Sequence, residues 1–190
     1  TGTLGTLEFN GTSAQTYNQG SSNLDLNFVI MNHSGTGLTL NTFMRIKTTT
    51  GSLTLTAGKI ITGANEVVVF NRTPASVSIG NSTSYVEGFL RRYINATGSY
   101  DFPVGQSVRG YERANINLSS NSNIDNLLAS FIPYAVVPGP LGLSECLATY
   151  NLNALDDGKW IINAYNTGST QISGNAVYNM TLYNRAGSYT

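Results

Sequence analysis

Residues 85–105 read YVEGFLRRYINATGSYDFPVG, and they separate two kinds of β sequence. Before this stretch, apolar residues come in short alternating groups between Thr, Asn and Gly. After it, the apolar segments are longer, richer in aromatic residues and interrupted by proline. We therefore predict an all-β protein whose architecture changes near residue 85.

Residues 1–84 are predicted to form a short parallel β-solenoid. Their apolar groups are about three residues long and alternate with period two, as at Leu24, Leu26 and Phe28. Hairpin strands usually run for about five or six residues, whereas a solenoid stacks shorter strands in parallel and turns at small polar corners. No fixed repeat length is evident, and a strand meander is the alternative. The direction of neighbouring strands, parallel or antiparallel, distinguishes the two.

Residues 85–190 are predicted to form an antiparallel β-sandwich, because long antiparallel strands usually pack as two sheets. The last strand places Tyr178, Met180 and Leu182 on one face. Prolines put the segment 133–140 at a sheet edge or in a loop. Residues 126–131 are the one stretch that suggests a helical turn. Strands are expected at 114–118, 131–137, 147–152, 160–165 and 177–183.

The chain carries few charges. Charged residues make up 11% of its 190 residues, and ten basic residues balance ten acidic ones. Ser, Thr and Asn, about a third of the chain, must therefore keep it soluble. Without a net charge nothing attracts the protein to nucleic acid or anionic lipid, and the apolar runs are too short to span a bilayer. We predict no nucleic-acid partner and no membrane insertion.

Several motifs together resemble a known module. They are GSLTLTAGKIITGANEVVVF at 51–70, YVEGFLRR at 85–92, GSYDFPVG at 98–105, DGKW at 157–160 and YNMTLY at 178–183. This succession is similar to a module of large surface and secreted proteins of the Bacteroidota, although Phe89 stands where that family usually has proline. The resemblance covers nearly the whole chain. It implies an extracellular or cell-surface protein of the gliding-adhesin, filament or exoprotein kind, exported by type IX secretion.

The resemblance also implies a missing part of the sandwich. In such relatives the sandwich continues for several strands past the position of Thr190. Residues 85–190 are thus expected to be incomplete at the C-terminal end, because the chain is an excerpt or because a neighbouring subunit supplies a strand. A start at Thr1, without Met or a signal peptide, likewise suggests a mature fragment or an excerpt.

Arg91 and Arg92 form the only basic cluster. Adjacent strand residues point to opposite faces, so one of them turns inward, where a carboxylate should meet it. Glu87 and Asp101 are the nearby candidates. We predict a structural ion pair that locks the two halves, and a site for a glycan carboxylate or a phosphate is the alternative.

No catalytic, cofactor-binding or metal-binding residues are predicted. His33, the only histidine, lies in a Gly-flanked turn and is expected to face solvent, with no second histidine or thiol nearby. Ser119, Ser120 and Ser144 lack the G-x-S-x-G setting of a hydrolase nucleophile.

Carboxylates give no clear acid–base pair. Asp156 and Asp157 are adjacent and are expected to form a turn rather than a glycosidase pair. With Asp25 and Asp125 they are potential Ca²⁺ ligands, but the sequence contains no calcium-binding loop motif.

Aromatic residues leave a second function open. Alternating aromatics in strands usually belong to the core or to cross-strand pairs, yet exposed ones can stack on sugars. We assign Trp160, Tyr100, Phe102 and Val104 to the core, and Cys146 to the buried apolar residues. The tyrosines available for sugars are Tyr111, Tyr134, Tyr150, Tyr165 and Tyr183.

Taken together, the sequence predicts a non-enzymatic extracellular structural or adhesive module of a bacterial surface protein or filament. It would need no cofactor and would self-associate, or contact neighbouring domains of the same large protein, by β-strand addition. The alternative is a carbohydrate-binding accessory module of a secreted polysaccharide-degrading enzyme. An exposed row of two or three aromatics beside Asn or Asp would favour that alternative.

Overall fold

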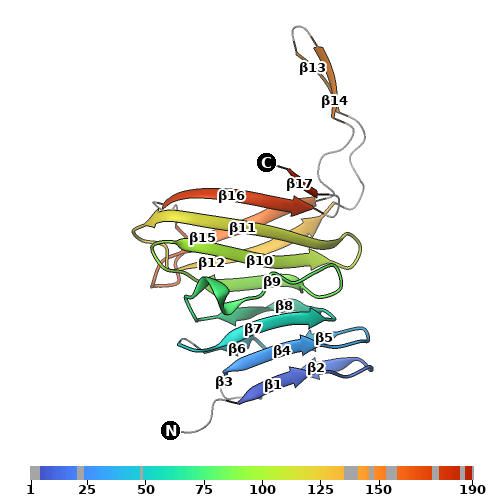
Figure 1. Ribbon diagram of the computed structural model, residues 1–190, viewed down its shortest axis with the longest axis vertical. Coiled ribbons are helices and arrows are strands. Elements are labelled where there is room, and N and C mark those ends of the chain that lie inside the picture. The colour runs from blue at the N-terminus through green and yellow to red at the C-terminus, as the bar shows by residue number, and fades with distance from the viewer. Residues whose placement is uncertain are drawn as a thin grey trace.

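The computed structural model describes residues 5–20, 24–47, 49–134, 141–145, 148–152, 158–172, 176–184 and 187–189. Apart from one short 3-10 helix, η1 (Pro74–Ser76), its regular elements are all strands, which confirms the all-β prediction. A parallel β-solenoid begins at the N-terminal end, and an antiparallel β-sandwich continues the same stack (Figure 1). The described residues contain no helix long and apolar enough to cross a membrane.

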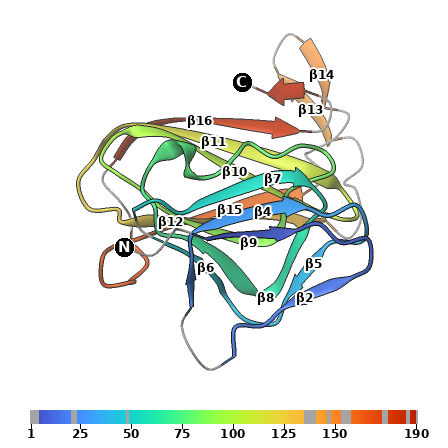
Figure 2. The ribbon, with the colours of Figure 1, turned by 60° about the horizontal axis from the view of Figure 1, so that its bottom comes forward.

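The solenoid has three faces, and neighbouring rungs on each face pair in parallel (Figure 2). This direction excludes the meander. The first face contains β1 (Thr6–Phe9), β4 (Phe28–Asn32) and β7 (Ser52–Ala57). The second contains β2 (Gln15–Tyr17), β5 (Leu38–Leu40) and the start of β8 (Ile60–Val69), and the third contains β3 (Asp25–Leu26), β6 (Met44–Ile46) and the end of β8.

A repeat does exist, but its length varies from turn to turn. On the third face Asp25 pairs with Arg45, 20 residues later, whereas on the second face Ile60 pairs with Val86, 26 residues later. Because only the strands are held in register, corners of different length are tolerated. Inward side chains still align in apolar columns, such as Val29, Leu53 and Val77.

The strand β9 (Val86–Tyr93) joins the two architectures. It pairs in parallel with β8 below, while above it the sheet divides into β10 (Gly98–Gln106) and β12 (Asn126–Pro133). One sandwich sheet has the order β10, β11 (Gly110–Asn121), β16 (Ala176–Asn184) and β17 (Gly187–Tyr189), and the other pairs β12 with β15 (Gly158–Tyr165). A single buried cluster runs from Tyr17 to Phe131, across the predicted boundary at residue 84.

The helical turn predicted at 126–131 is wrong, because these residues lie in β12. Leu127, Ala129 and Phe131 face the core with period two, and pairing with β9 and β15 overrides the local preference. The core assignments are confirmed for Tyr100, Phe102 and Val104, which are fully buried. Trp160 is partly buried and packs edge-on against Phe131, with ring centroids 5.7 Å apart.

The inner face of the sandwich becomes more exposed to solvent toward the last strands. On the inner face, Leu118 and Ile116 of β11 are 3% and 4% exposed, yet their cross-strand partners Tyr178 and Met180 of β16 are 55% and 45% exposed. Tyr178, Met180 and Leu182 do share one face, as predicted. A separate two-stranded sheet contains β13 (Leu141–Glu145) and β14 (Ala148–Leu152).

Some predicted positions lie outside the described residues. They are Cys146, Asp156, Asp157, Pro138 and Pro140, together with the side chains of Ser144 and Tyr150.

Candidate functional site

Arg92 occupies an inward position in the solenoid. On the third face the column Leu26, Ile46 and Val69 continues with Arg92, whose side chain is fully buried. Burial lowers the pKa of its guanidinium to about 10, because the charged form loses hydration.

Backbone carbonyls and the Ser76 hydroxyl, rather than a carboxylate, accept the Arg92 hydrogen bonds. Nη1 donates to the Asp101 carbonyl of β10 at 2.6 Å, and Nη2 donates to the Pro74 carbonyl of η1 at 2.6 Å. The Tyr100 and Phe102 rings lie 5.2 and 5.8 Å from the guanidinium carbon. Because η1 takes the place of a strand on the first face, Arg92 links this part of the solenoid to β10 of the sandwich.

The predicted ion pair with Glu87 or Asp101 is therefore wrong in its partners. The inward arginine binds carbonyl oxygens, and the nearby carboxylates bind other cations. The ion pairs observed are Arg91 with Glu66 at 2.7 Å, Arg113 with Asp101 at 2.8 Å, and Lys59 with Glu87 at 3.7 Å.

The prediction that His33 faces solvent is also wrong. Its side chain is buried, with Nδ1 accepting from the Gly35 N–H at 3.0 Å and Nε2 lying 2.8 Å from the Ser13 carbonyl oxygen. This pattern assigns the proton to Nε2, which donates to Ser13. His33 thus joins the turn of the second rung to that of the first, so it has a structural role.

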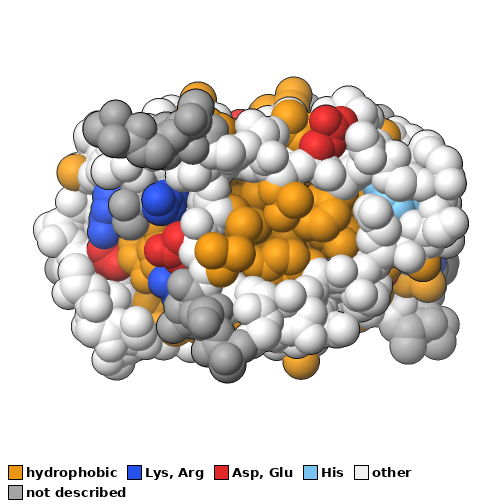
Figure 3. Space-filling view, turned by 90° about the horizontal axis from the view of Figure 1, so that it is seen from below, with side chains coloured by type: hydrophobic (Ala, Val, Ile, Leu, Met, Phe, Trp, Pro, Cys, Tyr) orange, Lys and Arg blue, Asp and Glu red, His pale blue; other side chains and the backbone are white. Residues whose placement is uncertain are grey.

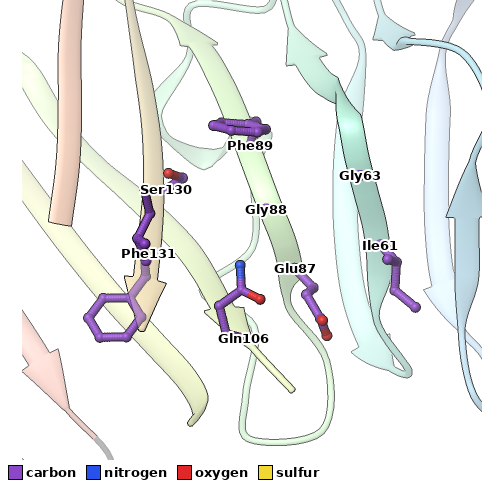
Figure 4. Close-up of a pocket in the computed structure, with 9 residues that line it drawn as sticks. Ile61, Gly63, Glu87, Gly88, Phe89, Gln106, Ser130 and Phe131 are labelled. Carbon is purple, nitrogen blue, oxygen red and sulfur yellow. The ribbon is translucent and has the colours of Figure 1, made fainter. Parts of the chain in front are cut away.

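A small pocket, here called the fork pocket, lies where the sheet divides above β9 (Figure 4). Gly88 and Phe89 fall between the part of β9 that pairs with β10 and the part that pairs with β12. Ser130 and Phe131 of β12 lie on one side of the opening and Ile61 of β8 on the other. The volume is about 180 Å³.

The fork pocket offers little chemistry. Ser130 is buried and its hydroxyl has no hydrogen-bond partner, so the space suits an ordered water. Glu87 is the only carboxylate in the lining, and it already accepts from the Ser107 hydroxyl and pairs with Lys59. A single engaged carboxylate provides no acid–base pair.

A larger feature, here called the Arg72 groove, consists of two adjoining hollows of about 350 and 610 Å³ that share Arg72 and Asn95. Turns from successive levels of the stack line it. The smaller hollow includes Phe70 and Tyr93, and the larger includes Asn121, Asp125 and Asn166. The sequence alone does not predict this groove, although asparagines recur in its turns.

Arg72 is the centre of this groove and is held in place. It donates to the Ile94 carbonyl at 2.5 Å and pairs with the buried carboxylate of Asp125. Its guanidinium also lies over the Tyr93 ring at 5.4 Å, and the Tyr93 and Phe70 rings pack at a tilt of 36° with their centroids 4.8 Å apart. Arg72 is therefore fixed by its hydrogen bonds and by the aromatic ring that it covers.

Apart from Tyr150, whose side chain is outside the described residues, the predicted sugar-stacking tyrosines have separate surroundings. Tyr165 and Tyr183 lie under the guanidinium groups of Arg91 and Arg113, both at 4.4 Å. Tyr111 donates to the Ile79 carbonyl, while Tyr134 is exposed.

The calcium candidates Asp25 and Asp125 each pair with an arginine instead, Arg45 and Arg72 respectively. No group of three or more His, Cys, Asp or Glu side chains suited to a metal ion occurs in the part of the chain that the structure describes.

Tyr111 gives a prediction for alkaline conditions. Burial raises its pKa to about 12, above the value near 10 expected in the unfolded chain. The stability that this shift contributes is complete below pH 10 and is lost as the pH rises through 12. We expect Tyr111→Phe to lose less stability between pH 10 and 12 than the wild type, in urea unfolding. The lowered pKa of Arg92 changes stability in the opposite direction over this pH range, but Arg92 is present in both proteins, so its effect cancels in the comparison. Equal losses of stability in the two proteins would contradict the raised pKa of Tyr111.

Comparison of the chain with protein-family models, curated proteins and solved structures found no match. The resemblance to Bacteroidota surface modules therefore stays a prediction.

Proposed function

We propose that this chain is a non-enzymatic extracellular module that assembles end to end by β-strand addition, as part of a surface filament, stalk or adhesin. The observation that carries the proposal is the open first rung of the solenoid. The low charge and the sequence resemblance support the location outside the cell.

The base of the stack is an apolar surface with free strand edges. Within the described residues β1, β2 and β3 have partners only on the side of the second rung. Leu7, Phe9 and Leu26 pack on the core from this rung but are only partly buried. Seen from below, hydrophobic side chains fill the middle of the base inside a mostly polar border (Figure 3). Such an edge is a template for another strand.

The opposite end of the long axis offers a matching surface. Tyr178 and Met180 are exposed there on the inner face of the sandwich. Among the described strands β15 pairs only with β12, and residues 171 and 172 pair with its last two residues. Charge also favours contact between unlike ends. The only charged residues of β1, β2 and β3 are Glu8 and Asp25, whereas the only one of β15, β16 and β17 is Lys159. Asp25 is already paired with Arg45, so base-to-base contact would bring the Glu8 carboxylates of the two copies together.

The occupant of each end is therefore a second copy of this chain, oriented head to tail. An interface between two different surfaces that does not close into a ring generates an open filament. Assembly would cover Leu7, Phe9 and Leu26 at one end and Tyr178 and Met180 at the other, and the burial of these apolar side chains supplies the driving force.

Substitution on the inner face of β16 tests this proposal. We expect the wild-type chain to grow in mass with concentration in light scattering, and Met180→Lys to shift growth to at least tenfold higher concentration. Val177→Lys is the matched control, since Val177 is exposed on the other face of the same strand. A wild-type chain that stays monomeric throughout, or equal effects of the two substitutions, would overturn the proposal.

A further inference from the structure

The Arg72 groove has the chemistry of a binding site that assembly does not use. It is formed by turns that follow β8, β9, β11 and β15, so it crosses from the solenoid onto the sandwich. Both hollows fall in the range of small-molecule sites, roughly 300–1,000 Å³. Two adjoining hollows suit a ligand with more than one unit.

The groove is polar but electrically balanced. Among the described residues of either lining, Arg72 and Asp125 are the only charged ones, and they pair with each other. An anionic ligand such as a uronate or a phosphate would find no unpaired cation among these residues. The ligand expected here is neutral.

Several polar groups remain available to such a ligand. Asn166 accepts from the Thr170 N–H with its side-chain oxygen, which leaves its amide nitrogen free to donate. Asn95 is exposed, and its side-chain nitrogen makes only a long contact, at 3.4 Å, with the Arg72 carbonyl, while its backbone N–H donates to the Tyr100 hydroxyl. Amides both donate and accept, as sugar hydroxyls do, so the two groups are complementary.

The aromatic rings of the groove, Phe70 and Tyr93, would contact a ligand through their edges. Phe70 and Tyr93 stack on each other, and the guanidinium groups of Arg45 and Arg72 lie over them at 4.6 and 5.4 Å. Because neighbours occupy the ring faces, hydrogen bonds rather than stacking would carry recognition. Weak binding, with a Kd on the order of 1 mM, follows from so few direct anchors.

We propose that the Arg72 groove binds a neutral oligosaccharide chain. The side-chain amides of Asn95 and Asn166 would donate hydrogen bonds to its hydroxyl groups and accept hydrogen bonds from them. The inference goes beyond the assembly role, because the groove lies on the side of the stack and needs neither open end.

Amide chemical shifts in nuclear magnetic resonance provide the test. The probes are oligomers of glucose, mannose and N-acetylglucosamine, with a galacturonate oligomer as the charged comparison. Using Met180→Lys as the background keeps the sample small, so that the outcome is independent of assembly. We expect at least one neutral probe to shift the amides of Arg72, Asn95 and Asn166.

The variant Asn95→Ala should weaken binding about fivefold, the effect of one lost hydrogen bond of about 1 kcal/mol. Asn117→Ala, an exposed amide on β11 outside the groove, should leave binding unchanged. The absence of shifts at tens of millimolar for every neutral probe, shifts that gather elsewhere, or tighter binding of galacturonate would each overturn the assignment.

Discussion

Replacement of Arg92 with methionine is expected to lower the free energy of unfolding by about 3 kcal/mol, because each buried acceptor left unpaired costs about 1–3 kcal/mol. The acceptors are backbone carbonyls of Pro74 and Asp101, which no compensating substitution can remove. Chemical unfolding measures the loss. Arg92→Lys should also be destabilised, since a single ammonium group cannot reproduce the guanidinium fork.

Arg45→Met is the control for this result. Arg45 pairs with Asp25 at 2.8 Å on the surface and is partly exposed, so its loss should cost well under 1 kcal/mol. Buried charges can often be replaced by apolar side chains without loss. An Arg92→Met protein as stable as the wild type would show that apolar packing alone can close the top of the solenoid.

Substitution of Gly88 with alanine is expected to destabilise the fold by about 2–4 kcal/mol, because a strained backbone conformation costs about 1–3 kcal/mol before any steric overlap. Gly88 has a φ of 123°, and a Cβ there would overlap the Thr62 hydroxyl. That hydroxyl accepts from the Phe89 N–H at 3.1 Å, so it cannot move freely. Thermal or urea unfolding gives the difference.

Gly63 provides a milder comparison, because its backbone lies in the left-handed region that alanine can enter and no atom crowds it. It also has a positive φ, 57°, but a Cβ there would meet nothing within 4 Å. Gly63→Ala should therefore cost only about 1 kcal/mol. Equal losses at the two positions would mean that the close approach between β8 and β9 is not what requires glycine at residue 88.

The local pattern of the sequence was sufficient to predict the architecture. Short period-two groups separated by neutral turns predicted parallel rungs, and the parallel pairing of β4 with β1 and β7 confirms it. The repeat length was missed because corners vary while strands keep their register. At 126–131 tertiary contacts determine the secondary structure, because β12 lies between β9 and β15. The local propensity of a single sequence does not report such long-range pairing.

Side-chain partners were harder to predict than strands. The alternation of Arg91 and Arg92 correctly indicated that one arginine faces inward, but its acceptors come from η1 and β10, which are brought together only by folding. A polar turn flanked by glycine predicts an exposed His33, yet this turn packs on the turn below. A signal for the Arg72 groove did exist, in asparagines at one corner of successive levels, such as Asn71 and Asn95.

Head-to-tail assembly is tested most directly by mixing two blocked variants. Leu24→Lys alters an exposed apolar residue of the first rung, and Met180→Lys alters the opposite end. Each variant alone should remain monomeric in sedimentation velocity, because each lacks one of the two surfaces. Their equimolar mixture should form a discrete dimer, since an intact base then meets an intact sandwich end. A mixture that sediments only as monomers, while the wild type assembles, would contradict the head-to-tail account.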